Sequence, residues 1–322
     1  MIPQKEIVVV IGMHRSGTSL LAHSVNLLGF HLGKKILSPA NDNPNGFWEN
    51  DRVIKINDSI LKKLKSGWAD YSALPENWEQ MSCLDEERAA ITHLLEDEFE
   101  DHDKIAIKDP RLCRTCKLWF PILEERGFTI KIVGTIRHPY EVAESLIRRN
   151  SDVHPQERLS REAAVLLWIR YIYERAVNTQ HFKESTYIFP DLLESGEAFF
   201  DSLIAFLSPE LKDLKHTKEL VLRSFSPKKR VAPSLPEDSE ISRIALSIWD
   251  HVTAERHGIA TSLQRLRDLE SEMAEIHRAD VLFREIYHSW KSHTAPLFSL
   301  QSKIEAPGRM MKKISSCLIN RR

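Results

Sequence analysis

The chain has 322 residues and carries 45 Lys and Arg against 46 Asp and Glu, so its formal net charge is -1. This length allows one large α/β domain, and the balanced charge excludes a basic surface that coats nucleic acid or anionic lipid, so any anion site must be local. No apolar run has the length of a signal peptide or a membrane span, and a domain of this size needs no disulfides, so we expect a soluble, cytoplasmic protein.

The first predicted elements are a strand and a helix joined by a loop. Residues 7–11 form a continuous β-branched run closed by Gly12, which is typical of a strand buried on both faces of a parallel sheet. From Thr18 onward, apolar residues recur at roughly helical spacing until Gly29. The amino-terminal segment therefore predicts a strand, a loop and a helix in that order.

Three further strands follow the same plan. Runs at 104–108 and 129–136 each end in charged or turn residues that lead into a helical pattern, and a short strand is predicted at 186–189 after a helix at 163–179. Alternating strands and helices indicate an α/β fold with a central parallel sheet of P-loop type, helices on both faces and ligands at the carboxyl ends of the strands. The long insertion at 31–103 is expected to shape a substrate site.

The loop after the first strand, GMHRSGTS, is predicted to bind an anion. A loop that runs from a buried strand into a helix leaves backbone N–H groups unpaired at the positive end of the helix dipole. Gly12 and Gly17 have the spacing of the Walker A motif, but Thr18 stands where its phosphate-binding lysine belongs. The positive charge comes earlier, at Arg15. The loop hydroxyls belong to Ser16, Thr18 and Ser19.

The segment Arg15-Ser16-Gly17-Thr18-Ser19 resembles the 5′-phosphosulfate loop K/R-S-G-T-S/T of the sulfotransferase family, nearest to its bacterial and tyrosylprotein branches. This resemblance implies that the loop holds the 5′-phosphosulfate of 3′-phosphoadenosine 5′-phosphosulfate (PAPS). It also implies that Arg15 stabilises charge on the bridging oxygen as the sulfuryl group leaves, with 3′-phosphoadenosine 5′-phosphate (PAP) as product. We expect His14 to help bind this donor, and the scheme requires no metal.

The resemblance also implies a site for the 3′-phosphate of the donor. The family has an arginine at the end of a later strand and a serine eight residues on, and Arg137 and Ser145 match both the spacing and the context. The alternative for Arg137 alone is a surface ion pair. The resemblance covers about residues 5–235. The family also has a late basic loop, usually of the form R-K-G, that closes over the nucleotide. Three basic residues match this loop here without that form. These are Lys228, Lys229 and Arg230.

Two carboxylates compete for the role of general base on the acceptor side. Glu49 lies in NPNGFWEN, which the resemblance places beside the acceptor, and Asp109 lies in IKDPR after the second strand. Either carboxylate can take a proton from a hydroxyl or amine, and we prefer Glu49 because Asp109 is equally suited to holding the loop or orienting Arg111. Lys108, in the K-D-P element similar to that of tyrosylprotein sulfotransferases, is expected to be a second cation for the transferring group. Its alternative role is that of a solvated lysine at a strand end.

Three alternative interpretations remain open: a kinase, a nucleotide-binding adaptor and a metal or redox site. A P-loop kinase shares the sheet and loop but requires the lysine that Thr18 replaces, and a non-catalytic nucleotide-binding adaptor is possible on the same loop. The pair Cys113 and Cys116 supplies only two of the ligands that zinc needs, so packed thiols are favoured. From the resemblance alone, the expected acceptor is a carbohydrate or a lipid-linked glycan.

The remaining segment, 236–322, is predicted to be a helical extension of a sulfotransferase domain that spans 1–235. It ends in APGRMMKKISSCLINRR, in which basic and apolar residues alternate. This tail predicts either contact with an anionic membrane surface or a protein partner, or a solvated terminus.

Overall fold

A computed structural model of the chain describes residues 5–39, 46–153, 159–189, 192, 195–208, 215–224 and 239–255. Its centre is a four-stranded sheet, in which every strand is parallel to its neighbours and the spatial order is β2-β1-β3-β4. The strands are β1 (Lys5–Ile11), β2 (Lys104–Lys108), β3 (Phe128–Ile136) and β4 (Lys183–Ile188). The parallel α/β sheet predicted from the sequence is confirmed, and the fourth strand begins three residues earlier than expected.

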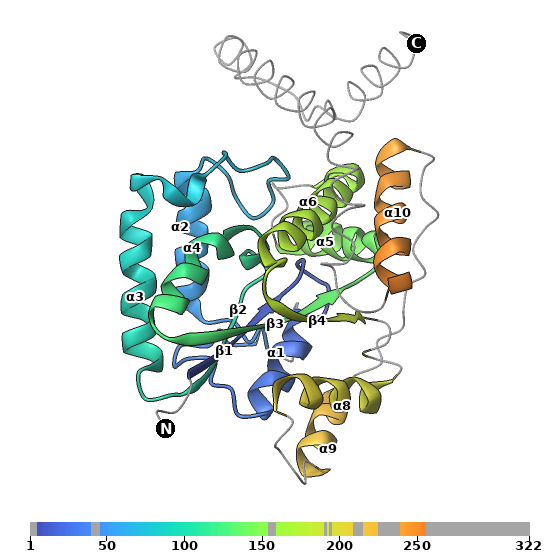
Figure 1. Ribbon diagram of the computed structural model, residues 1–322. Helices are drawn as coiled ribbons and strands as arrows, with labels where there is room; N and C mark the ends of the chain where they lie inside the picture. The colour runs from blue at the N-terminus through green and yellow to red at the C-terminus, as the bar shows by residue number, and fades with distance from the viewer. Residues whose placement is uncertain are drawn as a thin grey trace. The chain divides into compact units, whose positions relative to one another are not determined.

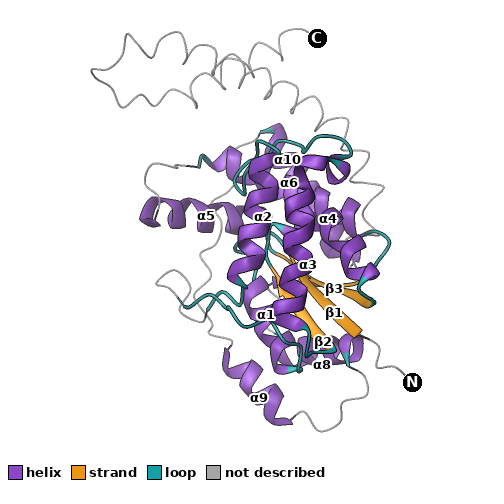
Figure 2. Ribbon diagram, turned by 90° about the vertical axis from the view of Figure 1, so that its left-hand side faces the viewer, coloured by secondary structure: helices purple, strands orange, loops and turns teal. Residues whose placement is uncertain are grey.

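Helices cover both faces of the sheet (Figures 1 and 2). In chain order they are α1 (Thr18–Leu27), α2 (Asp51–Lys63), α3 (Asp85–Phe99), α4 (Leu112–Glu125), α5 (Pro139–Val153), α6 (Arg161–Thr179), α8 (Gly196–Leu207), α9 (Lys215–Ser224) and α10 (Glu240–Glu255). In Figure 1, α1, α8 and α9 lie below the sheet, and α4, α5 and α6 lie above it.

Helices α1, α8 and α9 pack against the side chains of alternate strand residues. Val8 and Val10 of β1 and Val133 of β3 are fully buried in a cluster with apolar residues of α1, α8 and α9. Alternate residues of a strand point to opposite faces, so the other residues of the all-apolar run at 7–11 face the upper helices, as expected of a strand buried on both sides.

On the upper face, one glycine allows a charged side chain to reach the sheet. A Cβ atom at Gly134 of β3 would lie 1.8 Å from the guanidinium of Arg175 on α6, so a larger residue there would displace the guanidinium. Arg175 is fully buried, pairs with Glu184 of β4 and donates a hydrogen bond of 2.6 Å to Thr186. This pair ties α6 to the edge strand β4.

The insertion predicted at 31–103 contains α2 and α3, and α10 packs against α5 and α6. The boundary predicted after residue 235 stays a prediction, as does the tail, because residues 256–322 lie outside the described residues. None of the helices in the described ranges combines the length and the apolar character that crossing a bilayer requires.

Candidate active site

The loops that follow β1, β2 and β3 meet at one edge of the sheet because the three strands are parallel neighbours, with β1 in the centre. The loop after β1 carries His14 and Arg15, β2 ends at Lys108, and Arg137 follows β3. Three segments that are far apart in the sequence are therefore brought to the same edge by the sheet topology.

The backbone of the loop after β1 is shaped by two left-handed residues. Arg15 has a φ of 66° and Gly17 a φ of 100°. A Cβ atom at Gly17 would lie 2.2 Å from the ring of Phe189, so a glycine is required both by the conformation and by the space. Helix α1 starts at Thr18 without a side-chain cap at Gly17. The first amide groups of α1 have no acceptor within the helix, which is the arrangement that binds anions.

The side chain of Ser16 supports this loop from inside. It is fully buried, donates a hydrogen bond of 2.6 Å to the carbonyl of Met13 and forms another of 2.9 Å with the hydroxyl of Thr135 on β3. These contacts fix the loop to the neighbouring strand. The predicted donor contacts of Ser16, Gly17, Thr18 and Ser19 stay predictions.

The residues expected at the two ends of the donor are directly linked. Arg15 Nε donates to Ser145 Oγ at 3.0 Å, and Arg137 Nη1 donates to the carbonyl of Arg15 at 3.0 Å. Arg137 Nε also pairs with Glu141 at 2.7 Å, and its guanidinium lies 4.7 Å from the ring centroid of Phe189. The ion pair expected as the alternative for Arg137 is thus present, together with a contact to the loop after β1.

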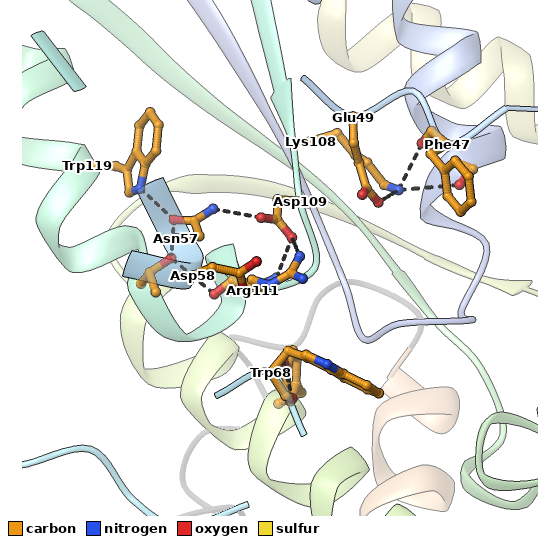
Figure 3. Close-up of polar contacts among 12 residues, drawn as sticks. Phe47, Glu49, Asn57, Asp58, Trp68, Lys108, Asp109, Arg111 and Trp119 are labelled. Carbon is orange, nitrogen blue, oxygen red and sulfur yellow. Dashed lines mark hydrogen bonds and ion pairs between the residues drawn. The ribbon is translucent and has the colours of Figure 1, made fainter. Parts of the chain in front are cut away.

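Lys108 and Glu49 form a buried ion pair beside this loop (Figure 3). Lys108 is 2% exposed, and its ammonium also donates to the carbonyl of Phe47 at 2.9 Å and to Ser19 Oγ at 3.3 Å. Between Phe47 and Glu49, Trp48 has a φ of 56°, a rare conformation for a bulky residue. The turn at Trp48 lets both of its neighbours reach the same ammonium group.

The environment of Glu49 raises the pKa of its carboxyl group. Burial is the main cause, the charge of Asp109 adds to it, and the charge and hydrogen bond of Lys108 oppose it. A carboxylate with a raised pKa binds a proton more readily, which suits a general base. The role of Glu49 as the general base stays a prediction.

Asp109, the competing carboxylate, is held within a network of hydrogen bonds (Figure 3). It is fully buried and accepts bonds from Asn57 Nδ2 at 2.9 Å and from the backbone N–H and Nη1 of Arg111 at 3.0 Å each. The indole N–H of Trp119 donates to Asn57 Oδ1 at 2.9 Å, which fixes the orientation of the Asn57 amide. These contacts orient the loop after β2, which favours the structural role for Asp109.

The sequence did not reveal that the 66–72 loop lies against the anion-binding loop. The ring of His14 lies 5.1 Å from Trp68 and 5.6 Å from Tyr171, measured between centroids. Tyr171 belongs to α6, and its hydroxyl donates to the carbonyl of Trp68 at 2.8 Å. No motif marks this contact in the sequence, and the aromatic character of Trp68 was the only signal.

The remaining candidates are the late basic loop, a metal centre and the two cysteines of α4. Lys228, Lys229 and Arg230 fall outside the described residues. Within the described part of the chain, no three His, Cys, Asp or Glu side chains are grouped as a metal ion requires. Cys113 and Cys116 are buried in α4, and burial raises the pKa of Cys113 to about 12, so it is a protonated thiol at neutral pH.

Comparisons with known proteins find similarity among solved structures. No protein-family model and no curated protein matches the chain. It is similar to the sulfotransferase domain from the curacin biosynthetic pathway, with 18% identity over 76% of this chain and 98% of that one and a TM-score of 0.41. Sulfotransferase STF9 from Mycobacterium avium is 11% identical over 78% of this chain and 77% of its own, with a TM-score of 0.49.

A third similar structure is the sulfotransferase domain from the Synechococcus PCC 7002 olefin synthase, which is 14% identical over 77% of this chain and 94% of that domain, with a TM-score of 0.40. All three structures have low sequence identity to this chain. The function of this chain must therefore be argued from its own residues.

Proposed function

We propose that this protein is an enzyme that transfers the sulfuryl group of PAPS to a hydroxyl or amine of an acceptor. The observation that carries the proposal is the junction of Arg15, Ser145 and Arg137, which joins an anion-binding loop to a second cationic group by hydrogen bonds of 3.0 Å. Two adjacent anion sites suit a nucleotide with phosphate groups at both its 5′ and 3′ positions. The absence of a Walker A lysine at Thr18 argues against a kinase.

The residues of the site supply the charges and the base that this reaction needs. PAPS brings an activated sulfuryl group. Arg15 and Lys108 provide cations for the negative charge that spreads over the transferring group and the leaving phosphate. Glu49 takes the proton of the acceptor as the new S–O or S–N bond forms and the bond from sulfur to the phosphate oxygen breaks.

The test of the donor is a titration of the protein with PAP, its 3′-dephospho analogue and Mg²⁺–ATP. We expect PAP to bind at least tenfold more tightly than the other two. Transfer of the sulfuryl group from radioactive PAPS is then measured with a panel of acceptors. The panel contains carbohydrates and lipid-linked glycans, because a carbohydrate is the acceptor we propose, and phenols and amines for comparison. Binding of ATP without binding of PAP contradicts the donor assignment, and PAP binding without transfer to any acceptor favours the adaptor.

Glu141→Gln is expected to raise the affinity for PAP by about threefold to tenfold. Glu141 lies 2.7 Å from Arg137 Nε and one helical turn before Ser145, so its charge competes with a phosphate for the same guanidinium. A neutral glutamine removes that competition and the repulsion of the phosphate. Isothermal titration with PAP measures the change.

The matched control for this prediction is Glu144→Gln, which removes a charge from the same helix on the side that faces Arg161 at 3.9 Å. It should leave the affinity for PAP within twofold of the original protein. An equal gain in both variants would mean that only the net charge of α5 matters. A loss of affinity in Glu141→Gln would mean that Glu141 positions Arg137 for the phosphate.

A further inference from the structure

The backbone of Glu49 is paired with a second segment of the chain. An isolated antiparallel bridge joins Ile36 to Asn50, the residue that follows Glu49. Beside this bridge, the N–H of Leu37 donates a hydrogen bond of 2.9 Å to the carbonyl of Glu49. The main-chain position of Glu49 therefore depends on the 34–37 segment.

The carboxylate of Glu98, on α3, binds both sides of this bridge. Its Oε2 accepts from the backbone N–H groups of Lys34 at 2.5 Å and Lys35 at 3.2 Å on one side, and from Asn50 Nδ2 at 3.1 Å on the other. Asn50 Oδ1 accepts from the N–H of Arg52 at 2.9 Å, so the Nδ2 group must face Glu98. One carboxylate oxygen thus joins three donors that come from both segments of the bridge.

Glu98 is buried and ionised. Its exposed fraction is 2%. Burial by itself would raise the pKa of its carboxyl group, but the hydrogen bonds from the chain and the charge of Arg52 lower that pKa below the ordinary glutamate value. Hydrogen bonds to an ionised acceptor are shorter and stronger than those between neutral groups. Truncation of Glu98 would take a strong shared acceptor away from all three donors.

The contacts of Glu98 lead through the chain to the reacting groups. Helix α3 packs against α2 (Figure 1), and the carboxylate of Glu98 reaches Asn50, which is next to Glu49. Glu49 in turn pairs with Lys108, whose ammonium also binds the carbonyl of Phe47. A general base must lie within hydrogen-bonding reach of the proton that it takes, and a displacement of about 1 Å can cost about 100-fold in rate.

We propose that Glu98 is a positioning residue for the sulfuryl transfer. By binding both sides of the bridge, it holds Glu49 where its carboxylate can take the proton of the acceptor. This inference rests on the proposed function and on Glu49 as its base. It gives α3 a part in the reaction through its contacts with the chain around Glu49.

The experiment is a double-mutant cycle between positions 98 and 49. Glu98→Ala and Glu98→Gln are made in the original protein and in the Glu49→Gln variant, and kcat is measured with radioactive PAPS and the best acceptor of the panel. Glutamine keeps an oxygen for the three N–H donors, whereas alanine removes the acceptor. Asp97→Ala is the matched control, because Asp97 also pairs with Arg52, at 2.9 Å, but its side chain is 64% exposed.

We expect Glu98→Ala to lower kcat by about 10- to 100-fold in the original protein, because the base is displaced. In the Glu49→Gln variant the same change should lower kcat by less than threefold, because no base remains to be displaced. Glu98→Gln should keep kcat within threefold of the original value, and Asp97→Ala within twofold. All these single variants should bind PAP within twofold of the original affinity, and thermal unfolding reports whether they fold.

Two further measurements examine the same contact. Asn50→Asp keeps the cap of α2 and removes the N–H group that Glu98 accepts, so it serves where Glu98→Ala impairs folding. It should lower kcat by about tenfold, and only where Glu49 is present. Hydrogen exchange of the Leu37 N–H reports the bridge without any acceptor. The exchange should be at least tenfold faster in Glu98→Ala and unchanged in Asp97→Ala.

Three results would overturn the inference. A loss of threefold or more from Glu98→Ala in the Glu49→Gln variant would show that Glu98 affects the rate by another route, as a purely structural residue does. An unchanged kcat or an unchanged exchange of the Leu37 N–H in Glu98→Ala would show that Glu98 does not hold the base in place. An equal loss in Asp97→Ala would assign the effect to the charge of α3.

Failure of the proposed function gives different results. A full kcat in Glu49→Gln would refute the assignment of the base. Failure of the original protein to bind PAP, or to transfer a sulfuryl group to any acceptor, would refute the sulfuryl transfer itself, whatever the exchange of the Leu37 N–H shows.

Discussion

Glu49→Gln is expected to lower kcat for sulfuryl transfer by about 10²- to 10⁴-fold, the usual contribution of a general base. Glutamine keeps an oxygen that can accept the hydrogen bond of Lys108, but it cannot take a proton from the acceptor. The affinity for PAP should change little because the substitution acts on the acceptor side. Transfer from PAPS to the best acceptor of the panel measures kcat, and titration with PAP measures donor affinity.

The pH dependence of kcat in the original protein should report the ionisation of Glu49. Burial raises the pKa of Glu49, and the base must be ionised to act, so kcat should rise with pH through that raised pKa. The acid limb should therefore lie above the usual glutamate value of about 4.3. Glu49→Gln should lose this limb. The folded chain also holds this proton more tightly than the unfolded chain, so the contribution of Glu49 to stability falls as pH rises through the same range.

Asp109→Asn is the variant that separates the two carboxylates. Asp109 accepts from Asn57 through one oxygen and from the backbone N–H and Nη1 of Arg111 through the other, and the indole of Trp119 prevents the Asn57 amide from turning over. An asparagine at position 109 must therefore turn its NH₂ group toward one of these donors, which leaves a buried group unsatisfied. We expect a loss of about 1 to 3 kcal/mol in the free energy of unfolding. The kcat of the folded protein should fall by less than tenfold. Glu125→Gln, on the exposed end of α4, is the neutral control. A larger loss of kcat in Asp109→Asn than in Glu49→Gln would make Asp109 the base.

Arg137→Ala is expected to weaken binding of PAP by roughly 30-fold or more. The change removes a charge-assisted contact to the 3′-phosphate, for which truncation of comparable charge pairs costs about 2 to 5 kcal/mol. It also removes the hydrogen bond to the carbonyl of Arg15, which helps to hold the loop. The 3′-dephospho analogue should bind the original protein weakly and lose little more in the variant. Isothermal titration with both ligands measures the two losses.

Arg148→Ala controls for the loss of a positive charge from the same region, because Arg148 is exposed on α5. It should leave both affinities within twofold of the original values. Equal losses for PAP and its 3′-dephospho analogue in Arg137→Ala would mean that Arg137 supports the loop through Arg15 and does not bind the 3′-phosphate.

The sequence alone determined the sheet and the edge of it at which the candidate site lies. The apolar run at 7–11 is fully buried in the central strand, as its uninterrupted β-branched character predicted. Parallel strands bring their carboxyl ends together, so the placement of Arg15, Lys108 and Arg137 at one edge followed from the order of strands and helices. These features depend on local patterns of a few residues, which are visible along the chain.

Only the tertiary structure decided which side chains meet at that edge. Glu49 and Lys108 are 59 residues apart, and their contact depends on the turn at Trp48, where the left-handed backbone carries no sequence signal. The sequence left Glu49 and Asp109 as competing bases, and the contact of Asp109 with Asn57 favours a structural role for it. The ring of His14 meets Trp68 because buried arginine and tyrosine side chains hold the 66–72 loop in place. Such contacts arise from the packing of distant segments, and neither spacing nor local propensity encodes them.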